Sequence, residues 1–378
     1  MVAITGSSAL PNSTRVVVKV GSALLVDEGK NTINTAWLAG IAKDISRLKS
    51  AGKDVVVVSS GAIALGSQLL KIHNKALSLQ EKQAAAATGQ VTLAHAWMEA
   101  LGVYKVQAAQ ILLSPDDTET RRKHLNARAT MGALLDLGAV PVVNENDTVA
   151  TAEIRFGDND RLAARVAAMI GADLLILLSD VDGLYTGNPN RNNCAAHLPR
   201  IDHITDSIMA MAGAANAQYA SGGMITKLEA GRISTAAGCH MIICDGRDPE
   251  PLFRLENGAR CTCFIATETP HAARKQWIAG ALTPRGTIGV DAGAAEALRN
   301  GKSLLPAGVV AIDGQFDRGD LVAVEDQSGK VIGHGLSSYG AADAAKIKGY
   351  KSREIETMLG YRGRDEIIHA DNLVVTDI

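Results

Sequence analysis

The stretch NENDTVATAEIRFGDNDRLAAR, residues 144–165, decides how the rest of the chain is interpreted. The apolar run before it, residues 140–143, predicts a buried strand. After it, apolar positions fall on one face of a predicted helix, at Leu162, Val166, Met169 and Ile170. Parallel α/β sheets bind their ligands at the carboxyl ends of the strands, so we expect the chemistry of this protein from Asn144 onward.

Charged residues crowd this stretch. The acidic residues are Asp147, Glu153, Asp158 and Asp160, interleaved with Arg155 and Arg161. An Asp or Asn before an apolar helical run often serves only as a helix cap, and this alternative stays open for each residue taken singly. Two charged clusters around one short insert exceed what two caps require, which indicates a site that orders cations or ionic substrates.

The composition limits the class of protein. The chain has 378 residues, 47% of them hydrophobic, and a formal net charge of -2. That length predicts two or three domains, and that charge gives no general attraction to nucleic acid or anionic membranes. No apolar run reaches the roughly 18 residues of a membrane span, and residues 1–14, a predicted leader, lack the features of a signal peptide. We therefore expect a cytoplasmic protein whose five cysteines are reduced thiols.

Three more buried strands are predicted to lead into polar residues. Residues 15–20 carry Lys19 near their end, residues 55–58 lead into Ser59 and Ser60, and residues 174–178 lead into Ser179 and Asp180. Helical patterns separate these strands, which is typical of a mainly parallel sheet with one ligand crevice. Lys19 can point its ammonium at a phosphate there, although a solvated lysine at a strand end is the simpler alternative.

A glycine-rich turn, SGGMITK at residues 221–227, precedes another predicted helix. Paired glycines let the backbone close on an anion, and a helix N-terminus favours a phosphate by up to about 2 kcal/mol. Lys227 falls in the first turn, where a cation opposes the helix dipole unless it binds an anion. No Gly-x-Gly-x-x-Gly motif follows a strand, which argues against a dinucleotide oxidoreductase.

The sequence pattern changes at residues 283–286, Thr-Pro-Arg-Gly. Short β runs punctuated by Gly, Asp and Pro then predict a small, mostly β domain over residues 283–378, after a first domain of residues 15–282. Residues 284–378 contain eleven Lys and Arg against fourteen Asp and Glu, a difference of -3. This balance is unfavourable for binding a phosphate backbone.

Together these motifs resemble the amino acid kinase family, in its branch with a C-terminal PUA domain. The resemblance covers nearly the whole chain from Arg15 onward, and its most specific parts are residues 144–147 with 149–153, 157–160, 183–185 and 222–227. It implies an α/β fold, an αβα sandwich around a mainly parallel sheet, plus a small mostly-β PUA domain. It also implies ATP-dependent phosphorylation of the γ-carboxylate of L-glutamate to L-glutamyl 5-phosphate, the first step of proline biosynthesis.

The resemblance further implies roles for individual residues. Lys19 and Lys227 bind the transferring phosphoryl group from opposite sides. Asp160 holds both lysines in place, and Asp158 assists as a catalytic residue. Glutamate binds to Ser60, Asp147 and Asn159. The implied ATP site comprises Lys19, Ser179, Asp180, Ser221, Gly222, Gly223, Met224, Ile225, Thr226 and Lys227. Mg²⁺ is held mainly by the ATP phosphates, with no direct protein ligand.

Asp147 gives the expected specificity a physical basis. Free glutamate offers its α-ammonium to a buried carboxylate. N-acetylglutamate offers a neutral amide instead and would leave that charge without a partner, which is strongly unfavourable in a buried site.

For partners, the resemblance implies feedback inhibition by proline, a homodimer or homotetramer, and handover of the unstable product to glutamyl phosphate reductase. Two alternatives stay open, a different amino acid kinase such as one for N-acetylglutamate, and a protein that mainly binds RNA through its PUA domain. The acidic balance and the 3% aromatic content argue against RNA binding, which usually needs basic grooves or stacking surfaces.

Overall fold

The computed structural model describes residues 5–27, 32–72, 77–149, 159–187, 189, 194–213, 223–280 and 283–376, without the side chains of 276, 277, 279 and 280. Contacts divide the chain into two compact units, Met1–Pro270 and His271–Ile378. Within the described ranges, no helix combines the length and the apolar character needed to cross a membrane. The five cysteines are free thiols; Cys194 is exposed and the other four are buried.

An eight-stranded sheet forms the centre of the first unit. Its strands are β1 (Arg15–Val20), β4 (Asp54–Val58), β5 (Ala108–Leu113), β6 (Val140–Glu145), β7 (Leu174–Ser179), β10 (Arg200–Ile201), β11 (His240–Asp245) and β12 (Cys261–Phe264). They lie in the order β10-β12-β11-β7-β1-β4-β6-β5. All neighbouring pairs are parallel except β11 and β12, which are antiparallel. The predicted mainly parallel sheet is confirmed.

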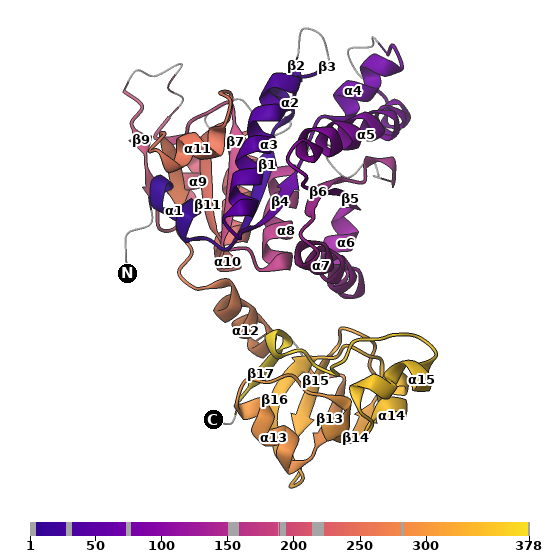
Figure 1. Ribbon diagram of the computed structural model, residues 1–378. Helices are drawn as coiled ribbons and strands as arrows, with labels where there is room; N and C mark the ends of the chain where they lie inside the picture. The colour runs from indigo at the N-terminus through magenta and orange to yellow at the C-terminus, as the bar shows by residue number, and fades with distance from the viewer. Residues whose placement is uncertain are drawn as a thin grey trace. The chain divides into compact units, whose positions relative to one another are not determined.

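Helices cover both faces of this sheet, which makes the unit an αβα sandwich (Figure 1). One core contains side chains from α1 (Gly6–Asn12), α2 (Ser22–Leu25), α3 (Thr35–Ser50), α4 (Ala62–Leu69), α5 (Leu79–Gly102) and α11 (Pro251–Glu256). The other contains side chains from α7 (Arg121–Asp136), α8 (Asn159–Ile170), α9 (Asp206–Gly213) and α10 (Met224–Ala236). Shorter elements are α6 (Pro115–Glu119), the 3₁₀ turn η1 (Asp147–Val149), and the paired strands β2 (Val26–Asp27) with β3 (Thr32–Ile33) and β8 (Leu184–Tyr185) with β9 (His197–Leu198).

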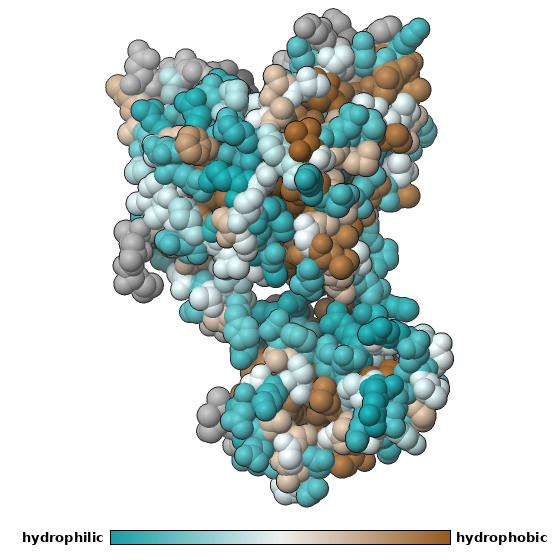
Figure 2. Space-filling model, viewed as in Figure 1, coloured by the Kyte–Doolittle hydropathy of each residue, from teal (hydrophilic) through white to brown (hydrophobic). Residues whose placement is uncertain are grey.

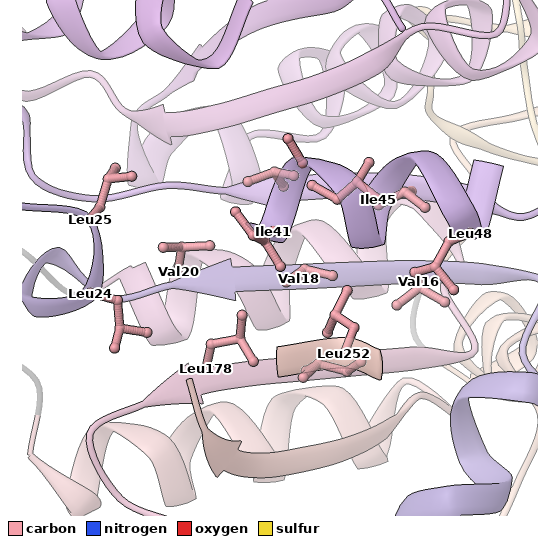
Figure 3. Close-up of a cluster of buried hydrophobic side chains, with 14 of the residues drawn as sticks. Val16, Val18, Val20, Leu24, Leu25, Ile41, Ile45, Leu48, Leu178 and Leu252 are labelled. Carbon is pink, nitrogen blue, oxygen red and sulfur yellow. The ribbon is translucent and has the colours of Figure 1, made fainter. Parts of the chain in front are cut away.

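Strand β1 shows how one segment serves both cores. Val16, Val18 and Val20 belong to the first core, whereas Val17 belongs to the second. Successive side chains of a strand point to opposite faces of the sheet, so this alternation follows from the sequence. Figure 3 shows Val16, Val18 and Val20 on the side of β1 where the apolar side chains of α3 gather. This alternation determines which face of the sheet each side chain of β1 points to.

A separate five-stranded sheet forms the second unit. Its strands are β13 (Gly286–Val290), β14 (Val309–Gly314), β15 (Leu321–Glu325), β16 (Val331–Leu336) and β17 (Leu373–Val375), in the order β14-β13-β15-β16-β17. Only the pair β13 and β15 is parallel among its described strands. Its helices are α12 (Pro270–Gly280), α13 (Ala292–Arg299), α14 (Ala341–Ile347) and α15 (Ile355–Leu359), with 3₁₀ turns η2 (Pro306–Gly308), η3 (Ser352–Glu354) and η4 (Ala370–Asn372). The predicted small, mostly β domain is confirmed.

The limits of the domains stay a prediction. The contacts separate the units between Pro270 and His271, which places most of α12 in the second unit, whereas the sequence indicated residues 15–282 and 283–378. Within the expected leader of residues 1–14, residues 6–12 form α1, and its Leu10 is fully buried in the first core. This segment therefore contributes to the packing of the first unit.

Candidate functional site

A cavity of about 580 Å³ lies at the carboxyl ends of the central strands. Residues at the ends of β1, β4, β6 and β7, or just beyond them, line it; among them are Lys19, Ser60, Asn144, Asp147 and Ser179. Asn159 and Lys227, from the starts of α8 and α10, line the same cavity. The structure therefore brings together, in one cavity, residues that lie more than 200 positions apart in the sequence.

The direction of Lys19 follows from its place in β1. Lys19 lies two residues after Val17 and therefore points to the same face of the sheet. That face is covered by α8 and α10, whose first turns carry Asp160 and Lys227. The alternation of buried valines in β1 thus directs this lysine toward the two other charged side chains.

Asp160 joins the two lysines. Lys19 Nζ lies 2.7 Å from Asp160 Oδ1, and Lys227 Nζ lies 3.2 Å from Asp160 Oδ2. The hydroxyl of Thr226 also donates to Oδ2, at 2.9 Å. All three charged residues are buried, with relative exposures of 9% for Lys19, 1% for Asp160 and 6% for Lys227. One carboxylate thus holds two ammonium groups at the edge of the cavity.

Electrostatics keep Asp160 ionised. Burial opposes its negative charge, but Lys19 and Lys227 outweigh this effect and hold the pKa of the carboxyl below its usual value. Two ammoniums and one carboxylate give the trio a formal charge of +1. Both lysines line the cavity, and ammonium groups are common partners of phosphate oxygens. The trio is suited to hold a phosphoryl group.

The N-terminus of α4 forms another wall of the cavity. The chain reverses at Gly61, whose φ of +106° is a conformation that favours glycine. Helix α4 then packs backbone against backbone on α5: a Cβ added at Gly66 would lie 1.7 Å from Ala85 O, and one at Gly89 would lie 1.8 Å from Ala62 O. This contact fixes the first-turn amides of α4 at the cavity, where a helix N-terminus favours an anionic group.

A buried network of amides links the strand ends. The Asn159 side-chain nitrogen donates to Ser60 Oγ at 2.7 Å, to the Ser59 carbonyl at 2.8 Å and to Asn144 Oδ1 at 3.0 Å. Asn144 in turn donates to Gln90 Oε1, at 2.7 Å. Because these bonds connect α8, β4, β6 and α5, they hold Asn159 and Ser60 in fixed positions relative to each other.

Asp147 is a buried carboxylate at the start of η1, 8% exposed. Burial raises its pKa to about 6. No hydrogen bond or ion pair reaches this side chain from the described residues. Since a buried anion without a partner is costly, the position suits a cationic group of a ligand.

Comparison with known proteins agrees with this geometry. Residues 14–245 match the model of the amino acid kinase family, and residues 286–359 match that of the PUA domain. The chain belongs to the amino acid kinase family. It is 54% identical over 368 residues to a "Glutamate 5-kinase" of Paramagnetospirillum magneticum, covering 97% of this chain and 99% of that protein. A "Glutamate 5-kinase" of a Bradyrhizobium species is 54% identical over 369 residues, covering 98% of each chain.

Among solved structures, a UMP kinase from Bacillus anthracis aligns with 68% of this chain and 98% of its own, at 16% sequence identity and a TM-score of 0.46. This similarity is too low to add to the family assignment.

The residues expected to bind ATP fall into two groups in this amino acid kinase. Ser179 and Asp180 line the cavity, and Ser179 Oγ donates to Asp180 Oδ1 at 3.0 Å. The other group begins α10: Gly223 is its N-cap, followed by Met224, Ile225 and Thr226. These four residues do not line the cavity itself, although Thr226 contacts Asp160. Asp158, Ser221 and Gly222 lie outside the described residues, so their expected roles stay predictions.

Lys82 is a cavity residue that the sequence did not indicate. It lies on α5, near the start of the helix, and lines the cavity together with Asp147 and Lys227. The capping box formed by Ser78 and Glu81 could be read from the sequence as a helix start. Nothing in the sequence shows which side of α5 faces the site, because this depends on how α5 packs against α4 and η1.

Proposed function

We propose that this amino acid kinase transfers the γ-phosphoryl group of ATP to the γ-carboxylate of L-glutamate, forming L-glutamyl 5-phosphate. Two observations support this proposal. The ammonium groups of Lys19 and Lys227, both bound to Asp160, line a cavity that also holds Asp147, a carboxylate without a partner among the described residues. In addition, relatives with matching length and 54% identity carry the name Glutamate 5-kinase.

The mechanism follows from charge. A glutamate γ-carboxylate has a reference pKa of about 4.3, so it is an anion at neutral pH and needs no general base. The obstacle is repulsion between this anion and the phosphates of ATP. Lys19 and Lys227 neutralise charge on the phosphoryl oxygens while the phosphoryl group passes from ATP to glutamate. The cavity aligns the two substrates for this transfer. Asp160 positions both ammoniums without contacting the reacting atoms.

Mg²⁺ is expected to accompany ATP. Among the described residues, no group of three His, Cys, Asp or Glu side chains could hold a metal ion. Mg²⁺ commonly binds through substrate phosphates and retained waters, and it does not need a cluster of protein ligands. The ion supplies charge neutralisation at the phosphates, while Lys19 and Lys227 supply it from the protein side. That Mg²⁺ has no direct protein ligand stays a prediction.

Glutamate binding is assigned to three residues in this proposal. Asp147 pairs with the α-ammonium, since it is buried and has no partner among the described side chains. Ser60 and Asn159 also contact the amino acid and are joined by a hydrogen bond of 2.7 Å. N-acetylglutamate has no ammonium and would leave Asp147 as an unpaired buried charge, so the site should discriminate against it.

The ATP site in this proposal comprises Lys19, Ser179, Asp180, Ser221, Gly222, Gly223, Met224, Ile225, Thr226 and Lys227, with Asp158 as a further catalytic residue. The first-turn amides of α10 support it, because Gly223 caps that helix without any side-chain bond. Unsatisfied amides at a helix N-terminus are suited to a phosphate.

Partners of the enzyme are proposed on the family resemblance. They are proline as a feedback inhibitor, further copies of the chain in a dimer or tetramer, and glutamyl phosphate reductase as acceptor of the unstable product. Figure 2 shows apolar residues gathered over α4 and α5, where Val91 is 71% exposed and Met98 50%. Exposed apolar surface of this kind supports self-association. A cytoplasmic location stays a prediction.

The direct test measures ADP release with L-glutamate, N-acetylglutamate and L-aspartate offered side by side, at saturating ATP and Mg²⁺. The proposal expects turnover with L-glutamate and little with the other two. Comparable turnover with N-acetylglutamate would exclude the pairing of Asp147 with an ammonium and overturn the proposed substrate.

A further inference from the structure

Lys82 lines the cavity, but the mechanism above gives it no task. It is partly buried and lies four residues after Ser78, the N-cap of α5. Ser78 and Glu81 form a capping box, in which the Ser78 amide donates to Glu81 Oε2 at 2.8 Å. The beginning of α5 is therefore a fixed element, and Lys82 occupies a defined place on the wall of the cavity.

Helix α5 is tied to the part of the site that carries Asp147. It packs against η1, which begins with Asp147. It also accepts, through Gln90, the hydrogen bond of 2.7 Å from Asn144 at the end of β6. Lys82 and Asp147 thus lie on two elements in direct contact and line one cavity, with opposite charges.

An α-amino acid carries two opposite charges close together, and such a pair of side chains matches them. Its ammonium and its α-carboxylate are attached to the same carbon, so their partners in a binding site must be neighbours. Asp147 supplies the anionic partner. Lys19 and Lys227 are both bound to Asp160, at the place of phosphoryl transfer. The third lysine of the cavity lining, Lys82, is on the element that contacts η1.

We propose that Lys82 binds the α-carboxylate of the amino acid substrate. This inference rests on the proposed function and deepens it, because it assigns the one charge of glutamate that had no side-chain partner. Asp147 and Lys82 then recognise the zwitterionic end of the substrate, while Lys19 and Lys227 act at the γ-carboxylate. Amines that lack an α-carboxylate, such as 4-aminobutyrate, are rejected although they still offer an ammonium to Asp147.

The test compares two substrates in four proteins. L-glutamate and L-isoglutamine differ only at the α-position, where isoglutamine carries a neutral carboxamide. The proteins are the wild type, Lys82→Met, Lys82→Arg and the control Lys49→Met; Lys49 is a partly exposed lysine on α3 that does not line the cavity. KM and kcat are measured for both compounds, and isoglutamine is also assayed as a competitor of glutamate.

For Lys82→Met, the KM for glutamate should rise by about 10- to 100-fold, as expected when a partly buried ion pair loses one partner. Its kcat should change little, and the constants for isoglutamine should stay near those of the wild type. Lys82→Arg should restore most of the glutamate affinity, because it retains the positive charge. Lys49→Met should match the wild type with both compounds.

Two results would overturn the inference. An equal loss for glutamate and isoglutamine would mean that Lys82 shapes the cavity without recognising the α-carboxylate. No change for either compound would assign the α-carboxylate to the backbone amides at the start of α4. Failure of the proposed function is distinguishable, since the wild type itself would then release no ADP with glutamate.

Discussion

Replacing Asp147 by Asn should make the protein more stable and at the same time impair glutamate binding. The buried carboxylate of Asp147 has no partner among the described residues, and burial raises its pKa from 3.8 to about 6. At 1.36 kcal/mol per pH unit, this difference corresponds to about 3 kcal/mol of stability lost when the carboxyl is ionised. Asn removes the charge and keeps the shape, so part of that free energy should return to the folded state.

The pH dependence of this stabilisation has a defined sign. The pKa of Asp147 is higher in the folded than in the unfolded protein, so the destabilisation is absent below pH 3.8, grows between pH 3.8 and about 6, and is complete above that range. Calorimetric unfolding of Asp147→Asn and of the wild type should therefore differ at pH 7 and coincide near pH 4. The surface variant Asp136→Asn, on the exposed side of α7, is the control and should show no such difference.

The same variant should raise the KM for glutamate about 30-fold or more, because removing one partner of a buried ion pair costs about 2 to 5 kcal/mol. The KM for ATP should change little, since Asp147 does not contact the phosphates in the proposed arrangement. An unchanged KM for glutamate would refute the pairing with the α-ammonium. A loss of stability at pH 7 would refute the reasoning about the unpaired charge.

Two further predictions concern pH and packing. In the wild type, the KM for glutamate should rise as the pH falls below about 6, because Asp147 then becomes protonated and loses its charge; a KM that stays constant down to pH 5 would contradict this. Gly89→Ala should lower both the urea midpoint and the activity. Its Cβ would lie 1.8 Å from Ala62 O and push α4 away from the cavity, and overpacking of this kind lowers the free energy of unfolding by about 1 to 3 kcal/mol or more. Gly102→Ala, in the same helix but with open space around it, should leave both unchanged, and equal effects of the two substitutions would exclude the packing explanation.

Much of the fold could be predicted because its signals are local. The runs of valine and leucine in β1, β4, β6 and β7 are buried on both sides, as the sequence indicated, and polar residues follow them at one edge of the sheet. Lys19 and Lys227 were singled out from a strand end and a helix start, and the structure places both on Asp160. The alternation of side chains along β1 and the position of Lys227 in the first turn of α10 direct both lysines toward the same site.

Other parts of the site depend on tertiary contacts and left no local signal. Gln90 and Lys82 belong to the alanine-rich α5, whose weak amphipathic pattern does not show which side is buried. Their positions follow from the approach of α5 to α4 at Gly66 and Gly89. The packing of α1 on the first core was missed for the same reason, because its few apolar residues find their partners on α11, more than 200 positions away.

The most direct test of the central claim is kcat for Lys227→Met, measured with saturating glutamate and ATP. Methionine keeps the unbranched apolar side chain and removes the ammonium that lies 3.2 Å from Asp160. If Lys227 neutralises the transferring phosphoryl group, kcat should fall by about 100-fold or more, the size expected for losing one preorganised group at a developing charge, in a protein that still folds. Turnover at the wild-type rate would contradict the claim that two convergent lysines carry out the phosphoryl transfer.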